Sequence, residues 1–158
     1  MRRLFVLLLI SLSFPAVAQQ PQFSPNAPPD QPSQVAAEEM KKFEAAIAPY
    51  IAQAKRTYPA AKAKFTAGLP VGQSFFVTTR LYDSSGAFEQ VFIAVRDIAD
   101  GRVSGRIWND IERVQGFRHG DDYAFPESDV MDWLITHADG SEEGNFVGKF
   151  LDTYAGGG

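Results

Sequence analysis

The strongest constraint on the fold is a change in the spacing of apolar residues near residue 70. Upstream of it, apolar residues recur every three or four positions, which is the spacing of one helical stripe. That stripe consists of Met40, Phe43, Ile47, Tyr50, Ala54, Tyr58, Ala61 and Phe65. From Gln73 onward the spacing becomes two, the period of a half-buried β-strand. Helices followed by a run of strands predict an α+β domain.

Two prolines are expected to divide the helical segment. Pro49 and Pro59 lack a backbone N–H and clash with the preceding turn, so an uninterrupted helix is unfavourable. We therefore expect a helix over about 35–47, a second from Pro49 and a third from Pro59. Ser33 is a candidate N-cap, and Gly68 ends the segment.

The alternating segments predict a twisted antiparallel sheet of about five strands, with helices on one face. Turn sequences between the segments indicate successive hairpins, and therefore a meander. Gly105, inside the third segment, predicts a bulge or a close backbone approach. The predicted strands cover residues 73–82, 88–96, 102–108, 122–125 and 131–136.

A short C-terminal helix is expected after Asn145, which is a candidate cap. Its apolar face should dock on the sheet and consists of Phe146, Val147, Phe150, Leu151 and Tyr154. The glycines at 156–158 predict a flexible tail. A single α+β domain is therefore expected over residues 35–155.

The N-terminus has the three-part pattern of a secretory signal peptide. A basic start precedes an apolar run over residues 4–12, and Ala16 and Ala18 provide a small-residue cleavage site. The run is shorter than the roughly 20 residues needed to cross a bilayer. We predict a signal peptide over residues 1–18, a periplasmic or secreted protein, and no transmembrane segment after cleavage.

Residues 19–34 predict a Pro/Gln-rich disordered tether. Five of these sixteen residues are proline, and only Phe23 is strongly apolar. Such a segment buries too little apolar surface to offset the entropy lost on ordering.

Composition excludes several classes of function. The chain has no cysteine, which excludes disulfides, thiolate metal sites and catalytic thiols. A formal net charge of -4 disfavours binding to nucleic acid. The only histidines, His119 and His137, are too few for a multi-histidine metal site. We therefore predict no metal and no cofactor.

Candidates for catalysis are few. A nucleophile needs an adjacent base held by an orienting group, and His119, in a turn before a strand, is the candidate base. The acidic cluster of Glu127, Asp129 and Asp132 offers carboxylates for acid–base chemistry or for a hard cation. The alternative is two turn residues and one structural aspartate. The sequence contains no G-x-S-x-G motif.

Two further motifs have no assigned role. Residues 139–145 offer oxygen ligands around a glycine turn, but they lack the repeated aspartates of a calcium loop. The favoured interpretation is a hairpin exit and a helix start, with Glu142 and Glu143 near the positive end of the helix dipole. Trp133 is expected in the core, and Asp132 is expected to accept backbone N–H groups or an arginine.

Strand alternation also predicts a binding surface. The face toward the helices should carry Val77, Val91, Ile93, Val95, Val103 and Ile107. The opposite face should carry aromatic residues interleaved with arginines, namely Phe76, Arg80, Tyr82, Phe92, Arg96, Arg106 and Trp108. Such a face suits an extended polar or anionic ligand. The alternatives are arginines paired with Glu89, Asp122 or Asp132, and a closed half-barrel that buries the aromatic residues.

Short motifs occur in order along the last two thirds of the chain. They are Ala54-Lys55-x-Thr57-x-Pro59, Phe75-Phe76-Val77, Glu89-Gln90-Val91-Phe92, Gly105-Arg106-Ile107, Gly120-Asp121, Asp132-Trp133-Leu134-Ile135 and the ending at 139–145. Through these motifs the chain resembles bacterial domain-of-unknown-function family 2314, which includes YegJ-like exported proteins. The resemblance implies a small α+β domain and no particular activity. Phe92 stands where much of the family is expected to have tryptophan, a conservative change for packing.

The sequence is compatible with three functions. The first is a non-enzymatic exported module that binds a protein or cell-envelope polymer through the arginine–aromatic face. The second is an envelope hydrolase that uses His119 or the carboxylates of Glu127, Asp129 and Asp132. The third is a structural accessory domain. Product formation from envelope material would indicate the second, retention without turnover the first, and neither the third.

The signal-peptide interpretation makes a direct prediction. The exported chain should begin at Gln19 or within a few residues of it, because cleavage follows the small-residue site. N-terminal sequencing of protein from a periplasmic extract tests this. A chain that keeps Met1 and remains in the inner membrane would contradict it.

Overall fold

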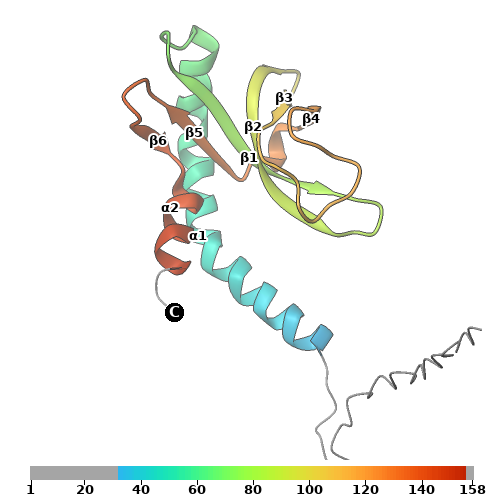
Figure 1. Ribbon diagram of the computed structural model, residues 1–158. Helices are drawn as coiled ribbons and strands as arrows, with labels where there is room; N and C mark the ends of the chain where they lie inside the picture. Colours follow the sequence, from blue (N-terminus) through green and yellow to red (C-terminus); the bar gives the residue numbers. More distant parts are fainter. Residues whose placement is uncertain (1–31, 156–158) are drawn as a thin grey trace, which may run out of the picture.

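The computed structural model describes residues 32–155 of the chain. The predicted signal peptide, most of the predicted tether and the C-terminal glycines lie outside these residues. The described part is an α+β fold with one long helix, a six-stranded antiparallel sheet and a short C-terminal helix (Figure 1). The elements are α1 (Pro32–Ala67), β1 (Ser74–Tyr82), β2 (Phe88–Ala99), β3 (Arg102–Ile107), β4 (Asp122–Pro126), the 3-10 turn η1 (Glu127–Asp129), β5 (Asp132–Thr136), β6 (Glu142–Gly144) and α2 (Phe146–Ala155).

The helical segment is one continuous helix, so the predicted division at the prolines is wrong. Helix α1 begins at Pro32, which places Ser33 inside it, and it passes through Pro49 and Pro59. Both prolines are exposed. The carbonyl that each leaves without an N–H partner can therefore bind water, and the helix bends instead of ending (Figure 1).

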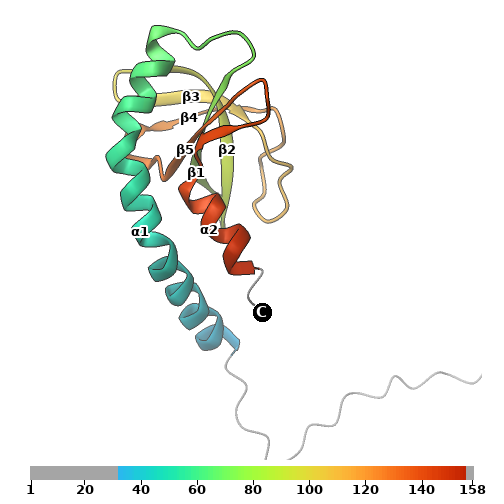
Figure 2. The same cartoon turned by 90° about the vertical axis from the view of Figure 1, so that its left-hand side faces the viewer.

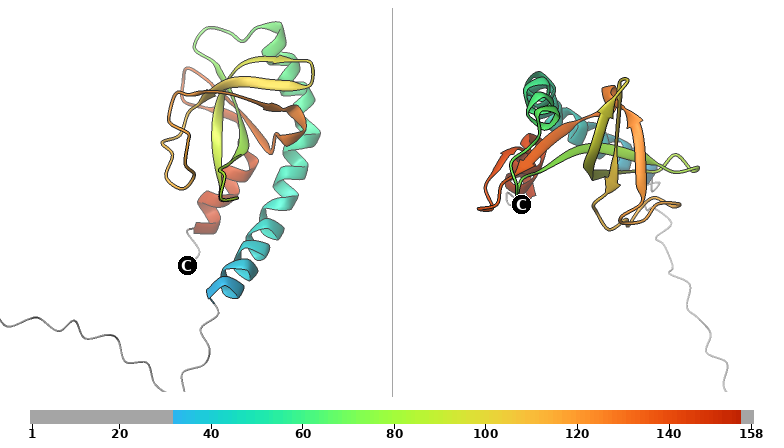
Figure 3. Two further views of the ribbon diagram at one scale, coloured as in Figure 1. Left: turned by 90° about the vertical axis from the view of Figure 1, so that its right-hand side faces the viewer. Right: turned by 90° about the horizontal axis from the view of Figure 1, so that it is seen from above.

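The sheet is a meander only over its first four strands. Its order is β4-β3-β2-β1-β5-β6, so β5 pairs with β1 at the far side of the sheet from β4. Residues 127–131 make this connection, and five residues span at most roughly 20 Å. The sheet must therefore curl so that β4 comes back toward β1, as the view from above shows (Figure 3). Thr79 of β1 accordingly donates a hydrogen bond to the Asp129 carbonyl at 3.1 Å.

The sixth strand was not predicted. Residues Glu142–Gly144 pair with β5 in an antiparallel register, whereas the sequence indicated a helix start there. Helix α2 begins only at Phe146. The glutamates therefore lie on an edge strand, and their carboxylates contact lysines instead of the positive end of the helix.

The core lies inside the curl of the sheet. Five of the six residues predicted to face the helices are at most 1% exposed, and only Val95 is half-buried. Val95 pairs with Gly105 at a register shift between β2 and β3, where the pleat is interrupted. The inward-facing residues pack in one cluster with Ala54, Tyr58 and Ala61 of α1. Small residues on α1 let the helix approach the sheet closely.

Helix α2 packs mainly beside α1, and only its first turn docks on the sheet, where the sequence predicted docking of the whole apolar face (Figure 2). The Phe150 ring stacks on Tyr50 of α1 with ring centroids 4.4 Å apart. Phe146 meets Trp133 of β5 edge-on at 5.9 Å, while Tyr154 is exposed. Within residues 32–155, neither helix has an apolar stretch of the length that a bilayer crossing requires.

Gly105 illustrates why the bulge needs a glycine. A Cβ at this position would lie 2.2 Å from the Ala94 carbonyl oxygen and 2.8 Å from a methyl group of Ile93. The sequence predicted a bulge or a close approach here, and both are present.

We expect Gly105→Ala to destabilise the fold by about 1–3 kcal/mol, because the added methyl group must push β2 and β3 apart. Urea unfolding measures the loss. The neighbouring change Ser104→Ala, which adds no atoms, should cost less than about 1 kcal/mol. Equal costs for the two variants would show that the close approach does not constrain the sheet.

Candidate functional site

The outer face of the curled sheet carries a cluster of three aromatic residues. Phe76 of β1 lies with its ring centroid 5.5 Å from that of Trp108 and 6.5 Å from that of Phe92. Phe76 is buried beneath its neighbours, and Phe92 is half-buried. Trp108, directly after β3, keeps 56% of its surface exposed. The indole ring of Trp108 is therefore open to solvent, while the rings of Phe76 and Phe92 pack against it from the protein side.

The backbone on either side of Trp108 is anchored to β2. The Trp108 N–H donates to the Phe92 carbonyl at 2.9 Å, and the Asn109 side-chain oxygen accepts from the Phe92 N–H at 2.7 Å. The His119 ring lies 5.8 Å from the Trp108 ring. These contacts hold the indole in place, which lowers the entropy that a ligand would have to remove.

Two arginines flank the aromatic cluster. Arg96 lies beside the bulge in β2, and Arg106 lies on β3. Both contact the Asp122 carboxylate of β4, at 3.0 and 3.5 Å, and about half of each side chain is exposed. Two positive charges therefore share one negative charge, and the patch keeps an excess positive charge.

Arg80 does not belong to this patch, although the sequence placed it there. Its guanidinium lies over the Phe88 ring at 4.5 Å and forms an ion pair with Glu44 of α1. Because the sheet curls, the end of β1 that holds Arg80 lies next to α1. Tyr82, the next residue on the same face, is exposed. We define the outer-face patch as Phe76, Phe92, Arg96, Arg106 and Trp108.

Two carboxylates of the β1–β2 hairpin hold the loop over residues 108–121. Glu89 accepts hydrogen bonds from the backbone N–H groups of residues 112–114 at 2.8–3.3 Å, and Asp83 accepts from that of Gln115 at 3.3 Å. Desolvation acts to raise the pKa of Glu89, but these N–H groups outweigh it and lower the pKa. Glu89 is therefore occupied by the loop and forms no ion pair with the outer-face arginines among the described residues.

Asp132 is a structural residue that joins β5 to α2. It is 1% exposed, and its two oxygens accept from the backbone N–H of Trp133 at 2.8 Å and of Val147 at 2.7 Å. Of the two partners that the sequence allowed, backbone N–H groups are the ones present. Asp132 of β5 thus caps the first turn of α2. Asn145 precedes the helix but donates to Glu142, and its own side-chain oxygen makes no hydrogen bond with the described residues.

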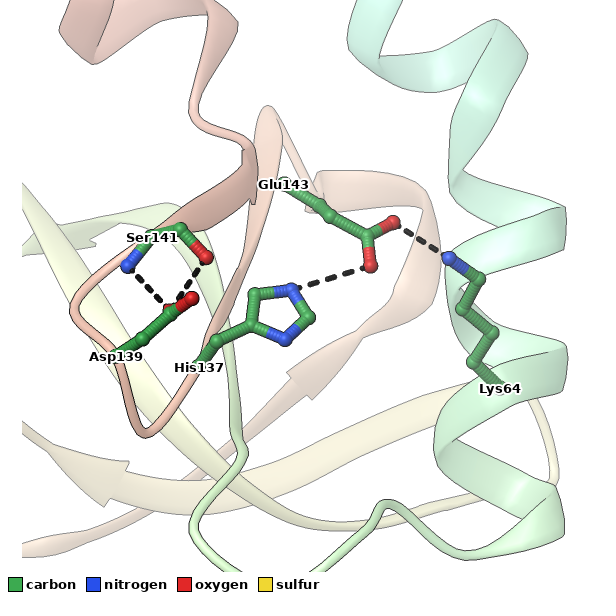
Figure 4. A network of polar contacts seen from close by, with 5 residues as sticks. All are labelled: Lys64, His137, Asp139, Ser141 and Glu143. Carbon is green, nitrogen blue, oxygen red and sulfur yellow. Dashed lines mark hydrogen bonds and ion pairs between the residues drawn. The ribbon is translucent and has the colours of Figure 1, made fainter.

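The segment after β5 forms a polar network on the surface (Figure 4). Glu143 of β6 accepts from Lys64 of α1 at 2.5 Å and lies 3.2 Å from the His137 imidazole. The hydrogen bond from Lys64 is the main cause of the lowered pKa of Glu143. Asp139 accepts from the backbone N–H and the hydroxyl of Ser141, which closes the turn. The network fastens the edge strand β6 to the long helix.

The candidate catalytic residues are not brought together. Glu127 binds Lys62 at 2.7 Å, and Asp129 accepts from the Ser128 hydroxyl at 3.0 Å. Asp132 is buried under α2, and His119 is 4.0 Å from the exposed Asp110. No cluster of three or more histidine or acidic residues suited to a metal occurs within residues 32–155.

Sequence reasoning missed a hollow of about 510 Å³ between α1, the end of β1 and β4. Its walls include Lys55, Arg80, Tyr123 and Asp129. These residues come from segments that only the curl of the sheet brings together.

Comparison with known proteins gave one match. A family model described as "Uncharacterized protein conserved in bacteria (DUF2314)" matches residues 36–153, most of the chain. No curated protein and no solved structure matches the chain.

The buried Asp132 makes stability depend on pH. Burial raises the pKa of its carboxyl from 3.8 to about 6, against the opposing effect of the two N–H donors. Between these two values the folded chain holds a proton that the unfolded chain has lost. Stability should therefore fall as pH rises from about 4 to 6, by up to about 1.4 kcal/mol per pH unit.

Urea unfolding between about pH 4.5 and 6 measures this slope. Asp132→Asn should remove the contribution, because the amide does not titrate. Carboxyls with lowered pKa, such as that of Glu143, give a slope of the opposite sign that is largest below their unfolded value of 4.5 and fades as pH rises through this window; because these groups are the same in both proteins, the comparison of wild type with Asp132→Asn isolates the contribution of Asp132. An unchanged slope in the variant would contradict the assignment.

Proposed function

Because this chain belongs to the DUF2314 family, which is described only as uncharacterized and conserved in bacteria, we propose its function from its own surface. We propose that it is an exported, non-enzymatic module that binds a protein or cell-envelope polymer with anionic groups. The observation that carries the proposal is the outer-face patch, where the exposed and anchored Trp108 follows Arg106 by two residues and Arg106 shares one carboxylate with Arg96.

The chemistry of the patch favours binding over turnover. A flat indole can stack on a sugar ring, an aromatic ring or a peptide plane. Binding costs it little entropy, because the contacts with β2 and His119 already fix its position. Arg96 and Arg106 attract carboxylate or phosphate groups and can form paired hydrogen bonds to them. The hydrolase alternative has no comparable support, since its candidate carboxylates are engaged separately. The export part of the proposal rests on the N-terminal signal pattern.

The double variant Arg96→Ala with Arg106→Ala tests the proposal. Exposed ion pairs contribute only about 0–1 kcal/mol, so the melting temperature should change little. Retention of the protein on immobilised envelope material should fall, and the residual retention should depend less on salt. The assays are a thermal melt and a pull-down from envelope extract at two salt concentrations.

A matched control removes two arginine charges that lie outside the outer-face patch. Arg56 and Arg113 are exposed, and neither side chain forms an ion pair within the described residues. The double change Arg56→Ala with Arg113→Ala should leave retention unchanged. Equal loss in both double variants would show that only net charge matters. Unchanged retention in the Arg96/Arg106 variant, with an intact melt, would show that the patch is inert.

A further inference from the structure

The hollow between α1, β1 and β4 is distinct from the outer-face patch and has the size of a ligand site. Its volume of about 510 Å³ lies within the range of small-molecule pockets. Lys55 contributes from α1, Arg80 from β1, Tyr123 from β4 and Asp129 from η1. The walls are therefore built from four separate elements, each fixed by the fold.

Two cationic side chains in the hollow have unused hydrogen-bonding capacity. Lys55 donates only to the Ser128 carbonyl at 3.3 Å, and among the described residues it has no carboxylate partner. Arg80 pairs with Glu44 through one terminal nitrogen, but its Nε is buried and has no acceptor within residues 32–155. This Nε is covered by protein atoms, so a ligand in the hollow does not reach it, and Lys55 is the cation with free donor capacity there.

The hollow also has an unneutralised negative charge. The Asp129 carboxylate accepts from the Ser128 hydroxyl but forms no ion pair with any described residue. Arg80 is already balanced by Glu44, which leaves Lys55 and Asp129 as one positive and one negative group on the same hollow. A ligand that complements both carries an acidic and a basic group. The Tyr123 ring in the wall provides a surface for the part between them.

The bordering strand indicates what connects those two groups. Strand β4 is at the edge of the sheet, and three of its residues line the hollow next to Tyr123, namely Ala124, Phe125 and Pro126. Edge strands can pair with an extended peptide, although on β4 the Ala124 carbonyl already accepts from Arg102 at 3.0 Å and Pro126 has no N–H, so only the remaining backbone groups can take part. We propose that the hollow binds a short peptide with free ends, whose carboxylate is held by Lys55 and whose ammonium group is held by Asp129.

Titration with tri-alanine tests this proposal on the chain as purified from cells that express the whole sequence. Saturable binding, followed by calorimetry and by amide chemical shifts around β4 and η1, is expected. Amidation of the peptide's C-terminus or acetylation of its N-terminus should each weaken binding by about tenfold, since each removes a charged hydrogen-bonding partner. The absence of saturable binding, or equal affinity for free and capped peptides, would overturn the proposal.

Variants assign the two ends. In Lys55→Gln the free and amidated peptides should bind alike, and in Asp129→Asn the free and acetylated peptides should bind alike. Lys41→Gln, on the exposed surface of the same helix, is the matched control and should retain wild-type discrimination. Discrimination retained in the Lys55 and Asp129 variants would overturn the proposal. The Arg96/Arg106 double variant should bind tri-alanine normally, so failure of the outer-face proposal and failure of this one are separately visible.

Discussion

The short connection between β4 and β5 is the constraint on which the rest of the structure depends. Residues 127–131 carry the chain from one edge strand to a position beside β1, and so few residues can do this only if the sheet curls. The curl encloses the core on its inner face, where α1 closes it. It also leaves the aromatic cluster outside and brings β4 near α1, which creates the hollow.

Carboxylates that accept backbone N–H groups hold the irregular parts of this fold in place. Asp132 joins β5 to the first turn of α2, and Glu89 with Asp83 fastens the loop that begins at Trp108. Each replaces hydrogen bonds that a regular strand or helix would have supplied. Asp132, one of the acidic residues that resemble a catalytic or metal-binding set in the sequence, is thus used for structure. The polar residues left for recognition are those on the outer face and in the hollow.

The two candidate surfaces differ in electrostatics. On the outer face two arginines share Asp122, so the patch attracts anions over a large exposed ring. In the hollow, one uncompensated cation and one uncompensated anion line a solvent-open space of limited volume. Tyr123 and Ala124 of β4 border both the hollow and the surface around Arg96. A single edge strand therefore separates a surface suited to a polymer from a space suited to a short ligand.

The sequence alone determined the α+β class, the positions of five strands and the last helix, and the inward-facing valines and isoleucines, because these depend on local spacing. It also predicted the irregularity at Gly105. The unbroken helix through Pro49 and Pro59 and the pairing of β5 with β1 were decided by tertiary structure, since solvent exposure and strand order are not local properties. For the same reason the separation of Arg80 from the outer-face patch, and the meeting of Lys55 with Asp129, appear only once the sheet curls.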